Sequence, residues 1–301
     1  MSLSGDLAMR ILRAVQPGKG SYSDLEKCRA KAKKENEGFV FSCPKDRRVT
    51  YKLVKHAPKP CLIMRPRSCR HTDKAVLYIY GGITNNWNTQ KNMAARYAVD
   101  TGTEVWYPVY PSFTEAPVTE ILGYLLRIYR TMLKRYPADH IVFCGVSMGG
   151  FYGLQMVNFI NHEKLALPMP GLVIAHSAGG FPDNDEDWRY LRRYERSDPM
   201  FSEADLRMTL RLMPCDREVP WWALSPAMGD LRNAPPCYLY YGEEMLAGNA
   251  VLYQRAFQRS GTADKLHIHI EPNMMHGYSC MPVFPESKRA YRETVSLIES
   301  L

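Results

Sequence analysis

The most constraining feature of this chain is the segment 139–151, which reads DHIVFCGVSMGGF. The apolar run 141–144 predicts a buried strand, and the residues after the segment have the pattern of a helix. Between the two, at 145–149, lies the pattern G-x-S-x-G, which turns a strand sharply into a helix. Its glycines leave room for neighbouring backbone. The turn should lift the hydroxyl of Ser147 above the sheet, beside the positive N-terminal end of the helix.

Strands and helices alternate along most of the chain. Alternation of this kind implies parallel pairing with right-handed crossovers, and hence an α/β sheet whose functional groups lie beyond the carboxyl ends of its strands. The expected strands are 39–43, 48–55, 61–64, 75–80, 103–109, 140–144, 171–176, 237–241 and 265–271. The expected helices are 7–15, 22–36, 88–100, 115–135, 148–162, 249–260 and 286–300, and 181–230 reads as an irregular insertion.

The length suits one large α/β domain or two small ones, and the composition is that of an ordinary globular protein. The chain has 301 residues, of which 46% are hydrophobic and 23% charged. No apolar run approaches the roughly 20 residues of a membrane span, so we expect no stable membrane insertion. Arg10, Arg13 and Lys19 interrupt the start of the chain, which predicts no secretory leader. Eight cysteines, scattered without a C-x-x-C pair, predict reduced thiols in a cytoplasmic protein rather than a disulfide framework or a zinc site, although their even number leaves disulfides open. We expect no metal and no cofactor.

Positive charge is concentrated at the start of the chain. Residues 1–75 carry 18 lysines and arginines against 7 acidic residues. Such an arm could contact nucleic acid or an anionic membrane. The run 27–34, however, interleaves its basic residues with alanine and is flanked by glutamate, as the solvated face of a helix does. No zinc finger, aromatic RNA-binding motif or internal repeat accompanies it, so we expect no nucleic-acid partner.

A nucleophilic serine needs a base and an acid, and two loops supply the candidates. His276, in the loop 272–278 after the last expected strand, is the best-placed imidazole to take the serine proton; His176 is another that could approach the site. The acid that holds the imidazole should follow another strand. The sequence GEE after 237–241 contains no aspartate, so we choose Glu244, with Glu243 as the alternative.

The third requirement is a pair of N–H donors for the negative oxygen that forms during acyl transfer. Met148, directly after the serine, supplies one donor. Gly81 and Gly82 follow the expected strand 75–80 and are the natural source of the others, because glycine lets backbone approach a substrate closely.

Several stretches together resemble a known family. They are the apolar strand and double glycine at 76–83, Tyr110 with Glu115, the G-x-S-x-G pattern, and the closing run Ser225-Pro226, Pro235-Pro236, 242–246 and 275–278. With the order serine, acid, histidine, they resemble the hormone-sensitive-lipase-like (acetyl-esterase-type) branch of the α/β-hydrolases over about residues 60–300. The chain departs from that pattern at Tyr80, where the family has histidine, at Ile83, where it has a third glycine, and at Thr114, where it has proline.

The resemblance implies both a fold and an activity. The fold is a single α/β-hydrolase domain over 1–301, with an eight-stranded, mostly parallel sheet flanked by helices and a helical cap from about 1–36 and 181–230. The activity is hydrolysis of small carboxylic esters, with short acyl chains, through an acyl-enzyme on Ser147. Two alternatives stay open: an amidase or peptidase with the same triad, and a catalytically silent binding protein on this fold. The oligomeric state also stays open, and a homodimer is compatible with the sequence.

Overall fold

One mixed sheet forms the centre of the molecule. The structure, a computed structural model, describes residues 2–20, 24–37, 40–56, 58–83 and 88–301. The strands in these residues are β1 (Val49–Val54), β2 (Cys61–Pro66), β3 (His71–Ile79), β4 (Thr103–Pro108), β5 (Ile141–Val146), β6 (Leu172–His176), β7 (Cys237–Tyr241) and β8 (Leu266–Ile270). Their order is β1-β2-β4-β3-β5-β6-β7-β8, and only the β1–β2 and β2–β4 pairs are antiparallel. The expected eight-stranded, mostly parallel sheet is therefore confirmed.

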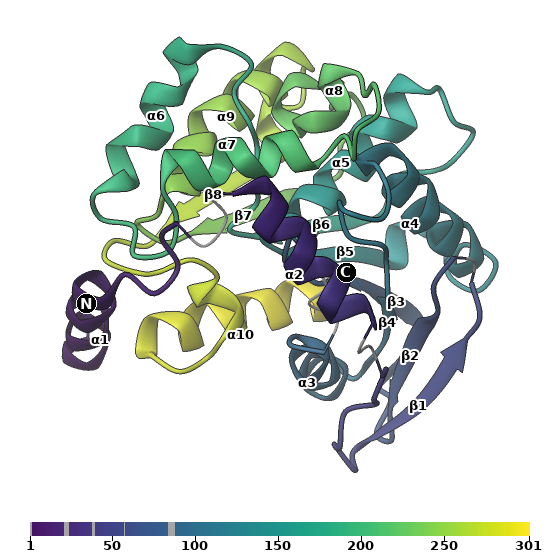
Figure 1. The fold of residues 1–301 in the computed structure, drawn as a ribbon. Helices are drawn as coiled ribbons and strands as arrows, with labels where there is room; N and C mark the ends of the chain where they lie inside the picture. Colours follow the sequence, from purple (N-terminus) through teal and green to yellow (C-terminus); the bar gives the residue numbers. More distant parts are fainter. Residues whose placement is uncertain (1, 21–23, 38–39, 57, 84–87) are drawn as a thin grey trace.

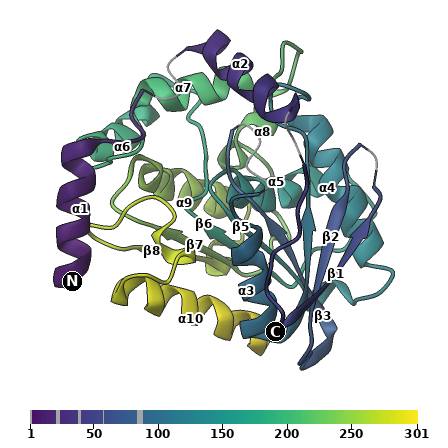
Figure 2. The same ribbon diagram turned by 60° about the horizontal axis from the view of Figure 1, so that its bottom comes forward.

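Helices cover both faces of the sheet (Figures 1 and 2). Those described are α1 (Leu3–Val15), α2 (Leu25–Glu37), α3 (Lys91–Thr101), α4 (Val118–Met132), α5 (Met148–His162), α6 (Asp185–Glu195), α7 (Glu203–Leu212), α8 (Trp221–Leu224), α9 (Asn249–Arg259) and α10 (Pro285–Ser300). α3 and α10 lie on one face, and α4, α5 and α9 lie on the other. Strands covered on both faces need apolar residues throughout, which is why β4, β5 and β6 are buried along their whole length. No helix in the described part of the chain is both long and apolar enough to cross a membrane.

Two expectations about local structure are wrong. Of the expected strand 39–43, residue 39 lies outside the described residues, and 40–43 are irregular. β1 is the edge of the sheet, and no other described strand pairs with its outer side. The segment 181–230, read from its pattern as irregular, contains α6, α7 and α8, so it is helical as the family resemblance implied. Side-chain caps begin two of these helices, since Asn184 accepts the N–H of Asp187 and Ser202 opens a capping box on α7.

The N-terminal helices lie against the insertion 181–230, although the two segments are far apart in the sequence (Figure 2). The guanidinium group of Arg13 donates to the carbonyl of Ser197 at 3.0 Å, and the ammonium group of Lys19 donates to that of Glu195 at 2.8 Å. Some of the basic residues near the N-terminus therefore bind the insertion, and the N-terminal charge is not only a solvated helix face.

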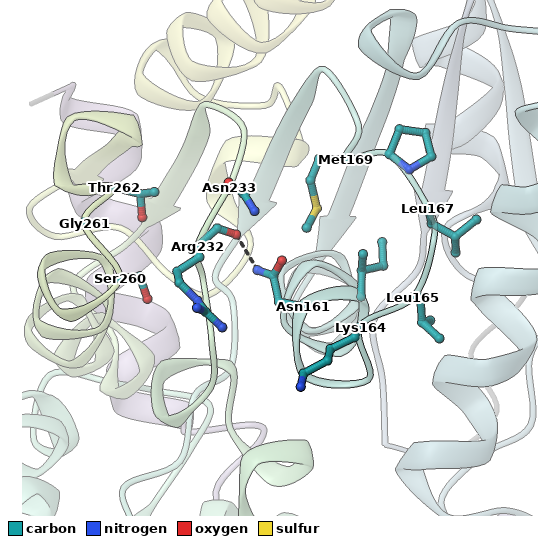
Figure 3. Close-up of a pocket in the computed structure, with 12 residues that line it drawn as sticks. Asn161, Lys164, Leu165, Leu167, Met169, Arg232, Asn233, Ser260, Gly261 and Thr262 are labelled. Carbon is teal, nitrogen blue, oxygen red and sulfur yellow. Dashed lines mark hydrogen bonds between the residues drawn. The ribbon is translucent and has the colours of Figure 1, made fainter.

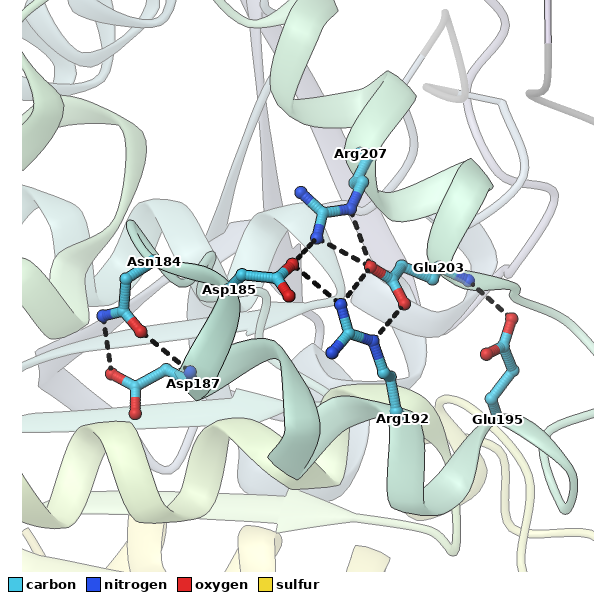
Figure 4. A network of polar contacts seen from close by, with 7 residues as sticks. All are labelled: Asn184, Asp185, Asp187, Arg192, Glu195, Glu203 and Arg207. Carbon is cyan, nitrogen blue, oxygen red and sulfur yellow. Dashed lines mark hydrogen bonds and ion pairs between the residues drawn. The ribbon is translucent and has the colours of Figure 1, made fainter.

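An ion-pair network joins α6 to α7 (Figure 4). Arg192 and Arg207 each reach the carboxylate of Glu203, at 2.6 and 2.7 Å, and both also reach Asp185 at 2.8 Å. Exposed pairs of this kind contribute less than about 1 kcal/mol each. Their fixed geometry nevertheless orients the connection between the two helices, which carries Asp198 and Phe201 toward the candidate site.

Candidate active site

Ser147 lies at a strained turn between β5 and α5. Its backbone has φ 56° and ψ −121°, a conformation that residues with side chains rarely adopt. A Cβ on Gly145 would lie 2.3 Å from the carbonyl carbon of Gly149, and one on Gly149 would lie 1.9 Å from the carbonyl oxygen of Ile79. The two glycines of the pattern are therefore required by the close approach of β3, β5 and α5, as the sequence suggested.

Glu244 and His276 meet at the carboxyl edge of the sheet. The Nδ1 atom of His276 lies 2.5 Å from Oε2 of Glu244. The Glu244 side chain is fully buried, and the His276 ring is only 11% exposed. A carboxylate in this position selects the tautomer with the proton on Nδ1, which leaves Nε2 free to accept a proton.

Glu243 has a different role from its neighbour. Its backbone N–H donates to the carbonyl of Met274 at 2.8 Å, and its carboxylate accepts the N–H of Asn273 at 2.8 Å. These contacts join the loop after β7 to the loop that carries His276. A Cβ on Gly242 would lie 2.2 Å from the carbonyl oxygen of Met274, so only glycine allows this approach.

Two opposing effects act on the pKa of His276. Burial lowers the pKa of the ring, whereas the charge and hydrogen bond of Glu244, and the charge of Asp198, raise it. The net result is a pKa above the ordinary 6.5. Asp198 is itself buried and accepts the N–H groups of Met245, Met200 and Phe201 at 2.7–3.1 Å. Nothing in the sequence pattern identified Asp198, because it comes from the insertion.

Ser147 and His276 line one pocket of about 440 Å³. Phe201 closes over the imidazole, with the two rings edge to face and their centroids 4.9 Å apart. Ser147 and Phe201 also border a second space of about 60 Å³, lined by apolar residues that include Met148 and Leu206. Among the described residues no hydrogen bond joins the Ser147 hydroxyl to the ring. Such contacts often tighten only when substrate is bound.

The double glycine after β3 lies beside the turn. A Cβ on Gly81 would lie 2.5 Å from the carbonyl oxygen of Val146. The N–H of Gly81 already donates to the side-chain oxygen of Gln90 at 3.0 Å. Gly82 has φ 120° and lines both spaces next to Ser147. For the N–H groups of Gly82 and Met148, no partner is found in the described ranges.

Tyr80 supports this loop where the family pattern has histidine. Its hydroxyl donates to the carbonyl of Tyr110 and accepts the N–H of Tyr110, both at 3.1 Å. The Tyr110 hydroxyl in turn donates to the carbonyl of Tyr80, and the rings stack with centroids 4.2 Å apart. Because both tyrosines are buried, these reciprocal bonds fix the end of β3 against the segment after β4.

His176 does not reach the pocket. It is fully buried at the end of β6, where its Nδ1 atom lies 2.8 Å from the hydroxyl of Ser279. Burial lowers its pKa to about 3, so the ring stays neutral. The expectation that His176 could approach the nucleophile is wrong, because its side chain turns into the core below the site.

A larger open pocket, of about 820 Å³, lies at the opposite edge of the sheet (Figure 3). It is bordered by the end of α5, the end of α9 and the loop before β7, with Asn161, Lys164, Arg232 and Ser260 in its lining. Its only hydroxyls are Ser260, which accepts the N–H of Leu231, and Thr262, which donates to the carbonyl of Leu231. No histidine lines it. In the residues that the structure describes, no three histidine, cysteine or acidic side chains gather as a metal site would require.

A comparison with protein families identifies the fold family. The family described as alpha/beta hydrolase fold matches residues 76–280, about two thirds of the chain. The chain belongs to this family. The family match covers β5, the Ser147 turn and the loops of Glu244 and His276.

Individual relatives are distant in sequence but similar in structure. An acetyl-hydrolase of Streptomyces hygroscopicus is 25% identical over 232 residues, which cover 74% of this chain and 75% of that protein. A solved esterase/lipase from an uncultured bacterium superposes with a TM-score of 0.79 at 21% identity, covering 100% of this chain and 99% of its own. An esterase of the bacterial hormone-sensitive lipase family gives a TM-score of 0.78 at 19% identity, covering 100% and 98%. The expected α/β-hydrolase fold is thereby confirmed.

Proposed function

We propose that this protein is a serine carboxylesterase that hydrolyses small esters with short acyl chains, with Ser147, His276 and Glu244 as its catalytic triad. The observation that carries the proposal is the contact of buried Glu244 with His276, whose ring lines the same pocket as the strained Ser147 turn. Fold alone does not determine activity. A buried acid paired to an imidazole beside a partly exposed, strained serine is the arrangement that acyl transfer requires.

Each proposed residue has a defined step. The Nε2 atom of His276 accepts the hydroxyl proton while the Ser147 oxygen attacks the ester carbonyl carbon. The tetrahedral intermediate then collapses, and His276 returns the proton to the departing alcohol. Water attacks the acyl-enzyme, again losing a proton to His276, and the carboxylic acid leaves as Ser147 recovers its proton. Glu244 stabilises the imidazolium that forms in both steps.

We propose that the N–H groups of Gly82 and Met148 bind the negative oxygen of the intermediate. Both border the space at Ser147, and Met148 begins α5, whose dipole adds positive potential there. The N–H of Gly81, expected to act with them, becomes available only when the Gln90 side chain moves away. This bond joins Gly81 to Gln90, the residue before α3.

The two unequal spaces at Ser147 support a preference for short acyl chains. An ester bound at Ser147 extends one substituent to each side of its carbonyl carbon. We assign the acyl group to the apolar space of about 60 Å³ and the alcohol to the pocket of about 440 Å³. A space of that size has room for only a few atoms, so a long acyl chain would not fit. We also propose that the N-terminal helices and the insertion 181–230 act as the cap over these spaces.

A fluorophosphonate and one substitution test the proposal. The reagent should modify Ser147 in the wild type, and Ser147→Ala should lower kcat for p-nitrophenyl acetate by about 10⁶-fold, because triad members act as a unit. Activity of Ser147→Ala within tenfold of the wild type would overturn the assignment. An unlabelled, inactive wild type would instead identify a silent binding protein, and faster cleavage of anilides than of matched esters would identify an amidase.

A series of p-nitrophenyl esters, from about two to about twelve acyl carbons, tests the assigned space. We expect kcat/KM to be highest for about two to four carbons and to fall steeply beyond them, because the apolar space has little room. An optimum at about eight carbons or more would show that acyl chains occupy the larger pocket.

A further inference from the structure

Ser177 joins the two loops that carry Glu244 and His276. It directly follows β6, is fully buried, and has φ 53°, in the left-handed region that favours glycine. Its hydroxyl donates to Oε1 of Glu244 and accepts the N–H of Gly277 at 2.8 Å. One side chain therefore contacts both the acid and the residue next to the base.

These contacts complete the binding of the Glu244 carboxylate. Its Oε2 atom faces His276, and its Oε1 atom accepts from Ser177 and from the N–H of Gly242 at 3.2 Å. Glutamate has one more rotatable bond than aspartate, so a glutamate acid needs more anchoring to hold a single orientation. The Ser177 hydroxyl is directed for this purpose, because the N–H of Gly277 occupies its oxygen and leaves its proton for the carboxylate.

The backbone conformation of Ser177 points the same way. A left-handed conformation would be unstrained with glycine, yet a residue with a side chain occupies the position. Its own N–H donates to the carbonyl of Tyr240 at 2.6 Å, which fixes the backbone from the β7 side. This bond to the neighbouring strand stabilises the strained backbone of Ser177. The side chain places a hydroxyl where the two loops meet.

We propose that Ser177 is a positioning residue that holds Glu244 and the His276 loop in the geometry the triad requires. The inference rests on the proposed esterase function, but its geometric part can be measured without catalysis. The proposal adds Ser177 to the three residues of the proposed triad. Ser177 acts through Glu244 and Gly277 and does not touch the substrate.

Two variants and one control distinguish a positioning role of Ser177 from a role in the stability of the fold alone. Ser177→Ala and Ser177→Gly both remove the hydroxyl, and the glycine variant also removes the backbone strain, so it covers the case in which the alanine variant does not fold. Ser279→Ala is the matched control. Ser279 is equally buried and its hydroxyl bonds to His176, away from Glu244.

The first measurement is the pKa of His276, followed by NMR of its ring in each protein. The charged groups that face the ring are Glu244, from the loop after β7, and Asp198, from the insertion. Without the hydroxyl the Glu244–His276 contact should loosen, so we expect a lower pKa in both Ser177 variants and no shift in Ser279→Ala. An unchanged or higher pKa would overturn the proposal, since it would mean that Glu244 keeps its position unaided. This readout decides the question even if the wild type proves inactive.

The second measurement is the steady-state rate with p-nitrophenyl acetate. We expect kcat to fall by about 10–100-fold in both Ser177 variants with KM nearly unchanged, as is typical when a group that orients a catalytic ligand is lost. Ser279→Ala should keep the wild-type kcat. A kcat within twofold of the wild type in Ser177→Gly would refute positioning, whereas absence of wild-type activity and of Ser147 labelling would refute the proposed function instead.

Discussion

We expect replacement by alanine to have opposite effects on stability at two glycines of the same helix. Gly149 and Gly153 both lie in α5, one turn apart. A Cβ on Gly149 would lie 1.9 Å from the carbonyl oxygen of Ile79 and 2.7 Å from that of Tyr80, both backbone atoms of the β3 end. A Cβ on Gly153 would meet nothing nearer than 3.6 Å, which is ordinary contact. Gly149→Ala should therefore be damaging and Gly153→Ala tolerated.

The size of the effect follows from these distances. Carbon contacts are optimal at about 3.5–4.0 Å, so alanine at position 149 would require a movement of more than about 1 Å between α5 and β3. Overpacking of this kind typically costs about 1–3 kcal/mol, and here backbone meets backbone, which favours the upper end. Replacing glycine by alanine in a helix gains about 0.5–1 kcal/mol. We expect Gly149→Ala to lose about 2 kcal/mol and Gly153→Ala to gain up to about 1 kcal/mol.

Urea unfolding followed by tryptophan fluorescence measures the free energy of unfolding of both variants, and kcat for p-nitrophenyl acetate measures the site. A displacement of about 1 Å at the turn should lower kcat of Gly149→Ala by about 100-fold, because Ser147 lies only two residues away. Gly153→Ala should keep the wild-type rate. If the two variants unfold at the same urea concentration with equal kcat, the close approach of β3 and α5 does not hold the nucleophile.

Three further predictions concern the protonation of His276, the charge of Asp198 and the support that Tyr80 gives to the end of β3. In the proposed mechanism the neutral form of His276 is the base. Because the pKa of His276 lies above 6.5, activity should fall as the pH drops through that higher value. Asp198→Asn removes a negative charge that raises this pKa, so the acid limb of the kcat–pH profile should move to lower pH. If the acid limb does not move, the charge of Asp198 has no effect on the protonation of His276. Tyr80→Phe leaves the buried N–H and C=O of Tyr110 without the hydroxyl partner and should lower the free energy of unfolding by about 1–3 kcal/mol. Unfolding equal to that of the wild type would contradict the supporting role of Tyr80.

The alternation of strands and helices was predictable because most of these elements have strong patterns. The helix 148–162 and the strand 237–241 have the expected bounds in the structure. The insertion 181–230 was read as irregular because α6 is mostly charged and buries only two of its side chains, Trp188 and Leu191. Its N-cap and its ion pairs with α7 stabilise this helix beside its short apolar face.

The candidate site was predictable only where a local motif marks it. Ser147 is marked by its glycines and His276 by its place after the last strand. Glu244 was chosen from the sequence with Glu243 as the alternative. What separates the two residues is how the loop after β7 meets the loop of His276, which no local motif specifies. Ser177 carries no motif, because its function depends on two partners that lie 67 and 100 residues further along the chain.

The N-terminal helix shows why the site cannot be treated as the sheet edge alone. Asp6 on α1 bonds the side chain of Asn273 at 2.9 Å, and Arg13 lies 3.6 Å from the carboxylate of Glu243 while also donating to the carbonyl of Ser197. α1 thus contacts the acid loop, the histidine loop and the insertion from outside, at positions next to the residues proposed for catalysis. A sheet edge fixes only where its strands end, and the relative position of the long loops beyond them needs such cross-connections. Through Asp6 and Arg13, α1 therefore connects the loop that carries His276, the loop that carries Glu244 and the insertion 181–230 to one another.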